Sequence, residues 1–209
     1  MYNLIQAGGI TMIPLSILAI IALAIAIDKI IFYYKLVIIP QKLVDLVESY
    51  NFDWKLLTDN LNNLNQQNCY RKFFSVIIKT QQQQDLIPIW WIESRTQDEV
   101  KTIEKKLINN LWILETIITA SPLLGLFGTI IGMMSSFKII GNNNIVNPTA
   151  VTAGVAESLI ATGFGLLIAI ISLFIFNYFS KQASQTIDEM ERLATKLIDH
   201  IKIDRKHQD

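Results

Sequence analysis

Residues 154–180 read GVAESLIATGFGLLIAIISLFIFNYFS, and this stretch decides the class of protein. Its one charged residue, Glu157, is also the only one in the 42 residues from Ile139 to Ser180. About 20 apolar residues cross a bilayer as a helix, so the stretch predicts a membrane span. An ionised carboxylate is costly in hydrocarbon and usually faces a cavity, a partner or an ion path. Two interpretations of Glu157 are therefore open. It is either a carboxylate at the membrane surface or a group that handles protons within the span.

Two further blocks of sequence avoid charge in the same way. Residues 1–27 carry no charged residue, and residues 107–137 carry only Glu115. Each block is long enough to cross a bilayer as a helix. The sequence therefore predicts an all-α membrane protein with three spans, at about residues 13–34, 112–138 and 154–178.

The first block has an alternative interpretation as a cleaved signal peptide, because Ala22-Leu23-Ala24 resembles a cleavage site. A basic leader is missing, however, and the segment continues into Asp28-Lys29 and an aromatic, basic flank that ends at Lys35. Such a flank is typical of an anchor at the membrane interface. We therefore expect the first block to remain as a span.

Basic residues predict the orientation in the membrane. Eleven Lys or Arg lie from Lys29 to Lys106 and six follow Ser180, whereas the connection 139–153 contains none. Positive charge favours the cytoplasmic side. We therefore expect the N-terminus outside, and a segment at about 36–110 and a tail at about 181–209 in the cytoplasm. The formal net charge is zero, which gives no indication of nucleic-acid binding.

Helical periodicity continues beyond the second and third spans. Apolar residues recur at spacings of three and four from Val100 to Leu114, and the third span continues in the same way to Ile201. An unbroken helix over 97–140 would be about 65 Å long. We expect both long helices to project into the cytoplasm and to form a hairpin with its turn, at 141–147, outside.

Small and hydroxylated residues repeat at helical spacing along the second and third spans. Membrane helices associate through such residues, which let backbones approach and hydroxyls bond across the contact. The stripes either pack the hairpin alone or, together with Glu157, also line a polar path. Thr129 and Thr162 can instead bond carbonyls of their own helices. The candidate packing or pore-lining residues are Gly125, Gly128, Gly132, Ser158 and Gly165, and the same stripes contain Ser136, Ala169 and Ser172.

Two rival classes of function are an intramembrane enzyme and a passive membrane scaffold. The spans contain no His, so they offer no nucleophile–base pair, and we expect no enzyme. Cys69 is the only cysteine, and His200 and His207 lie on the charged tail without a ligand partner. We therefore expect neither a metal site nor a cofactor. The residues leave the roles of Glu115 and of Trp90-Trp91 open.

Three segments carry a family resemblance. Ser121–Met133 reads SPLLGLFGTIIGM, and Gly154–Leu166 is followed by Ala169-Ile170 and Asn177. These resemble the second-span and third-span signatures of the TolQ/ExbB/MotA proton channel family. Ala7-Gly8-Gly9, with Asp28-Lys29 at the end of the first span, is similar to the ExbB and TolQ branch. Three spans instead of four argue against the flagellar MotA branch.

The resemblance implies a multi-pass subunit of an inner-membrane, proton-driven complex. It implies a homo-oligomeric ring, a pentamer, around the single spans of an ExbD- or TolR-like partner. That ring would pass proton-driven motion to a TonB- or TolA-like protein, for energised transport or for envelope maintenance. It assigns the proton pathway to Glu157, Thr129 and Thr162. The family usually has proline where Ile171 stands, so we expect a third span without that kink.

Overall fold

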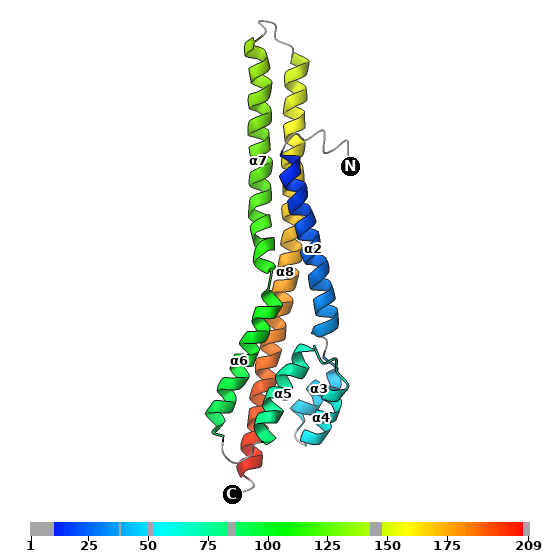
Figure 1. Ribbon diagram of the computed structural model, residues 1–209, viewed down its shortest axis with the longest axis vertical. Helices are drawn as coiled ribbons and strands as arrows, with labels where there is room; N and C mark the ends of the chain where they lie inside the picture. The colour runs from blue at the N-terminus through cyan, green and yellow to red at the C-terminus, as the bar shows by residue number, and fades with distance from the viewer. Residues whose placement is uncertain (1–10, 38, 50–51, 83–86, 143–147, 207–209) are drawn as a thin grey trace. The chain divides into compact units, whose positions relative to one another are not determined.

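The computed structural model describes residues 11–37, 39–49, 52–82, 87–142 and 148–206, without the side chains of 82, 138–142, 148–151, 153 and 157. Every regular element in these ranges is a helix, as predicted (Figure 1). Ala7-Gly8-Gly9 of the family resemblance and residues 143–147 of the expected turn lie outside them. The helices are α2 (Met12–Leu36), α3 (Gln41–Glu48), α4 (Trp54–Asn62), α5 (Cys69–Gln82), α6 (Ile89–Ile108), α7 (Leu111–Asn142) and α8 (Pro148–Lys206).

Among the described residues, three helical stretches are long and apolar enough to cross a membrane: Met12–Leu36, Ile89–Phe137 and Gly154–Lys206. They carry large apolar side chains that face outward. Ile20 on α2, Leu123 on α7 and Phe174 on α8 are 68%, 65% and 73% exposed. Side chains of this size need apolar surroundings, and in spanning helices lipid provides them.

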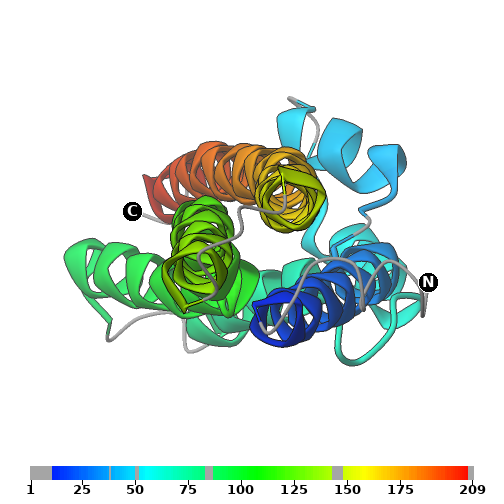
Figure 2. The same cartoon turned by 90° about the horizontal axis from the view of Figure 1, so that it is seen from above.

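The chain divides into two compact units. The apolar unit comprises residues 1–27 and 110–179, and the polar unit comprises residues 28–109 and 180–209. The apolar unit contains α7 and the first part of α8, which lie side by side in both views (Figures 1 and 2). α8 is helical through Ile171, the position where the family usually has proline.

The expectation of one unbroken helix over 97–140 is wrong. α6 ends at Ile108 and α7 begins at Leu111. Between them, Asn110 has a φ of 64°, in the left-handed region. Asn tolerates this conformation better than most residues, because its short polar side chain bonds locally. The apolar periodicity runs across the break, and for that reason the pattern alone did not reveal it.

The polar unit has its own apolar core. The segment at about 36–110 contains α3, α4, α5 and α6, with breaks at the Asn-rich run after Asn62 and at Pro88. Side chains from these helices pack against the end of α8. Two hydrogen bonds also join these helices to α8. The Trp54 indole donates to Asp204 Oδ2 at 2.8 Å, and Tyr70 Oη donates to Glu189 Oε2 at 3.2 Å. The fully buried core members include Leu57, Phe73, Phe74, Leu107, Met190 and Leu193.

Lys29 makes a buried contact in the polar unit. Its side chain is 3% exposed, and Nζ donates to the carbonyl oxygen of Leu107 at 2.7 Å. Leu107 lies in the last turn of α6, where carbonyls lack helical donors and the helix dipole favours a cation. The ammonium also lies 5.6 Å from the centre of the Phe32 ring. Lys29 therefore caps α6 next to the break before α7.

Candidate functional site

The predicted stripes meet where α7 packs against α8 in the apolar unit. Thr162 Oγ1 donates to the backbone carbonyl oxygen of Gly125 at 2.9 Å, so a hydroxyl of one helix bonds the backbone of the other. Such bonds occur where small residues let membrane helices approach closely. The structure thus brings Thr162 and Gly125, two residues predicted from sequence, into direct contact.

The glycines of the stripes lie at the points of closest approach. A Cβ on Gly125 would lie 2.8 Å from Thr162 Cα, and a Cβ on Gly132 would lie 2.7 Å from Ser158 Cβ. A Cβ on Gly165 would overlap the backbone carbonyl of Ser121. These distances are shorter than carbon atoms adopt in packed interiors. The glycines therefore permit the contact between the two helices.

Gly128 faces both α8 and Thr11, the residue before α2. A Cβ there would lie 3.2 Å from Ala161 Cβ and 2.5 Å from Thr11 Oγ1. By contrast, a Cβ on Gly163 would meet no atom of the described residues within 4 Å. Gly163 was not among the predicted packing residues, and it provides an internal comparison on the same helix.

Thr129 is not part of this interhelical bond. Its hydroxyl donates to the carbonyl oxygen of Leu126, on its own helix, at 2.7 Å. Its side chain is partly exposed. The structure describes the backbone of Glu157 as part of α8, and the Glu157 side chain lies outside the described part of the chain.

Comparison with known protein families gives a match over residues 65–192 to the MotA/TolQ/ExbB proton channel family. The chain belongs to this family. The matched range contains all of α7, α8 as far as residue 192, and every residue predicted for the site.

Relatives from three bacteria place the chain in the ExbB/TolQ branch. It is 32% identical over 180 residues to the putative biopolymer transport protein ExbB-like 3 of Synechocystis sp., a match that covers 83% of this chain and 82% of that protein. It is 34% identical over 91 residues to the biopolymer transport protein ExbB of Aquifex aeolicus, covering 44% and 62%. It is 39% identical over 84 residues to the Tol-Pal system protein TolQ of Pseudomonas aeruginosa, covering 40% and 36%. The last two matches thus span less than two thirds of those proteins.

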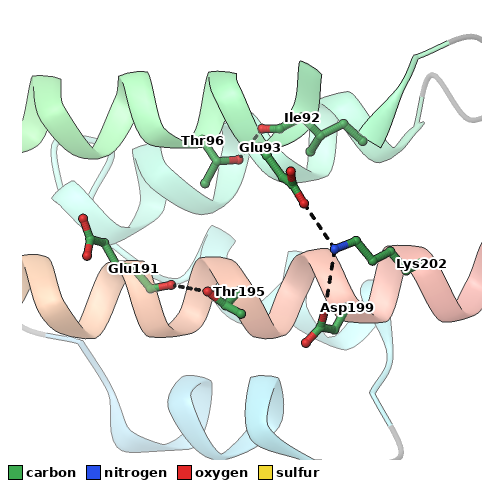
Figure 3. A network of polar contacts seen from close by, with 7 residues as sticks. All are labelled: Ile92, Glu93, Thr96, Glu191, Thr195, Asp199 and Lys202. Atoms are coloured by element: carbon green, nitrogen blue, oxygen red, sulfur yellow. Dashed lines mark hydrogen bonds and ion pairs between the residues drawn. The ribbon is translucent and has the colours of Figure 1, made fainter. Parts of the chain in front are cut away.

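A groove between α6 and α8 in the polar unit has a volume of about 540 Å³. Lys202 Nζ on α8 lies 3.2 Å from Glu93 on α6 and 3.9 Å from Asp199 (Figure 3). These side chains are 42–58% exposed, and such ion pairs contribute about 0–1 kcal/mol. We interpret these ion pairs as polar contacts along the surface where α6 packs against α8.

Sequence reasoning missed Ala161 and Ser121 as contact residues. Ala161 is fully buried and faces Gly128, and the backbone of Ser121 faces Gly165. Ala161 lies three residues after Ser158 and four before Gly165, so helical spacing already placed it in the stripe. The predicted stripe contained Ser158, Gly165 and Ala169 but left out Ala161. The role of Ser121 rests on its backbone, for which side-chain type gives no signal.

Proposed function

We propose that this chain is a subunit of an inner-membrane proton channel that couples the proton gradient to a periplasm-spanning partner. The family match over residues 65–192 carries this proposal, because it includes α7, the part of α8 that packs against it, and Glu157. The bond between Thr162 and Gly125 supports it, since it holds a hydroxyl in the contact between two apolar spans. The family comprises channel and transport subunits, so we propose no enzymatic activity.

The two threonines would act as hydrogen-bond acceptors along the path. A hydroxyl has one donor and two acceptor positions. Thr162 gives its proton to Gly125 and Thr129 gives its proton to Leu126. Both oxygens therefore offer lone pairs, which suit a donor such as water, hydronium or a protonated carboxyl group. Glu157 would supply negative potential or bind the proton transiently, since a carboxylate within a span commonly marks an ion path.

The ExbB/TolQ branch suggests which proteins assemble with this chain. We propose a homo-oligomeric ring, a pentamer, that surrounds the single spans of an ExbD- or TolR-like protein carrying a membrane aspartate. The ring would act on a TonB-like protein in energised transport or on a TolA-like protein in envelope maintenance. The distribution of Lys and Arg supports an N-terminus outside and a C-terminus in the cytoplasm.

Substitution of Glu157 tests this function against the alternative of a passive scaffold. Glu157→Gln keeps the volume and hydrogen-bonding capacity of the side chain but removes its charge and proton affinity. We expect the variant to assemble at the native size and to lose proton-driven uptake or envelope integrity. Glu157→Asp keeps the charge on a shorter arm and should retain part of the activity. Full activity of an assembled Glu157→Gln complex would favour the scaffold.

A further inference from the structure

The groove between α6 and α8 is a hollow that the proposed proton pathway does not use. It lies entirely within the polar unit, from Glu93 to Glu104 on α6 and from Glu191 to Lys202 on α8. Figure 3 shows the two helices side by side, with Glu93 opposite Lys202. The groove extends along each helix for about 16 Å, or about three turns, at 1.5 Å per residue. Its length therefore matches a short helix.

The groove has an apolar floor between two polar rims. Val100 of α6 and Ala194 and Ile198 of α8 line it, and they are 4%, 8% and 8% exposed. The charged residues that line the two sides are more exposed than these three. An apolar strip between two rows of polar side chains is the kind of surface on which amphipathic helices bind.

The rims carry more negative than positive charge. Four carboxylates and two ammonium groups line the groove, which leaves two net negative charges. Lys202 pairs with Glu93 and with a carboxylate of its own helix. Glu104 and Glu191 form no ion pair with the described residues, and neither does Lys101. In Figure 3 the Glu191 carboxylate lies at the opposite end from Lys202. The groove therefore favours a cationic occupant.

Trp90 extends the same face of α6 by one turn. It lies three residues before Glu93 and seven before Gln97, so these three residues share one face of the helix. Its side chain is 67% exposed, whereas the ring of the neighbouring Trp91 lies 5.0 Å from the Arg95 guanidinium. Trp at a binding surface commonly contributes a large part of the binding energy. An exposed indole next to the groove thus provides an anchor for an occupant.

We propose that this groove binds a basic amphipathic helix from the cytoplasmic segment of the single-span partner. Cytoplasmic segments beside a membrane span are rich in Lys and Arg, which complements the unpaired carboxylates. Apolar side chains of the bound helix would cover Val100 and Ile198. A Lys or Arg of that helix would bind Glu104 and Glu191, and a further side chain would pack on Trp90. The identity of the partner rests on the proposed function.

Photo-crosslinking in the assembled complex tests this contact. The photoreactive amino acid p-benzoylphenylalanine would replace Gln97, an exposed residue of the groove, in the full chain produced together with its single-span partner. The control position is Thr102, which is also exposed and lies about 140° around α6 from Gln97. We expect position 97, and not position 102, to crosslink to a Lys- and Arg-rich cytoplasmic segment of the partner.

Three outcomes of this experiment would overturn the proposal. One is the absence of a crosslink from position 97 in a complex that contains the partner. Another is equal crosslinking from positions 97 and 102. The third is a crosslink from position 97 to a second copy of this chain, which would show that the groove is a contact between subunits.

Substitutions in the groove test its chemistry. Glu104→Gln combined with Glu191→Gln removes the two unpaired charges at nearly constant size. We expect at least about threefold less crosslinked partner from position 97, because two favourable charge contacts are lost. Trp90→Ala should reduce the yield to a similar extent. Asp98→Asn removes an exposed charge outside the groove and should leave the yield unchanged. A yield that neither groove variant lowers would contradict the proposed contact.

Activity separates the groove from the proposed function. A crosslink from position 97, together with full activity of Glu157→Gln, would support the groove and contradict the proton pathway. An inactive Glu157→Gln without any crosslink would support the pathway and overturn the groove. Absence of a single-span protein from the purified native complex would overturn both.

Discussion

Gly165→Ala tests whether the α7–α8 contact depends on the absence of a side chain. The added Cβ would overlap the carbonyl oxygen of Ser121 and lie 3.2 Å from its carbonyl carbon and 3.4 Å from Gly125 Cα. All three are backbone atoms, so rotation of a side chain cannot relieve the overlap. The helices must move apart, which would lengthen the 2.9 Å bond between Thr162 and Gly125.

Three contributions determine how much Gly165→Ala changes the free energy of unfolding. Overpacking typically costs about 1–3 kcal/mol, and loss of one hydrogen bond costs about 1 kcal/mol. Alanine in place of glycine restores up to about 1 kcal/mol of helix propensity. We therefore expect Gly165→Ala to lower the free energy of unfolding by about 1–3 kcal/mol, as these magnitudes combine.

Gly163→Ala is the matched control, because it changes the same helix two residues away and its Cβ meets nothing within 4 Å in the described part of the chain. It should be neutral or more stable by up to about 1 kcal/mol, from helix propensity alone. Both variants would be unfolded in the same detergent by heat or denaturant, followed by circular dichroism. Equal stability of Gly165→Ala and Gly163→Ala would refute the packing argument.

Two other predictions concern the capping lysine and the orientation. Lys29→Met should destabilise the protein by about 1–3 kcal/mol in thermal unfolding, because it leaves the Leu107 carbonyl unsatisfied; an unchanged unfolding temperature would contradict this role. A cysteine placed at Asn143 should react with an impermeant reagent added outside, and cysteines at Lys105 and Arg192 only with reagent on the cytoplasmic side, as the basic residues predict. The reverse labelling pattern would contradict the predicted orientation.

The sequence predicted most of the fold because hydropathy and helical period are strong, additive signals over spans of about 20 residues. It also identified Gly125, Gly132 and Gly165 as points of close approach, since small residues in a span have few other uses. The family signatures lie in the same segments. These features are encoded locally, within one or two helical turns.

Features that depend on backbone detail escaped prediction. The break at Asn109–Asn110 interrupts a continuous apolar stripe, and only the left-handed Asn110 reveals it. The buried contact of Lys29 joins residues 78 positions apart, and its acceptor is a backbone carbonyl. The buried Ser172 hydroxyl makes no hydrogen bond to the described residues, whereas Ser121, Ser136 and Ser158 each bond a carbonyl of their own helix. Residue type alone carries none of this information.

Proton flux through the purified complex is the most direct test of the central claim. The complex, with its single-span partner, would be reconstituted into liposomes that contain a pH-sensitive dye, and a potential would be imposed across the membrane. We predict acidification of the interior by the native complex and none above empty liposomes by an equally assembled Glu157→Gln complex, since Gln binds no proton at these pH values. Native-rate flux through Glu157→Gln would contradict the assignment of Glu157 to the proton path.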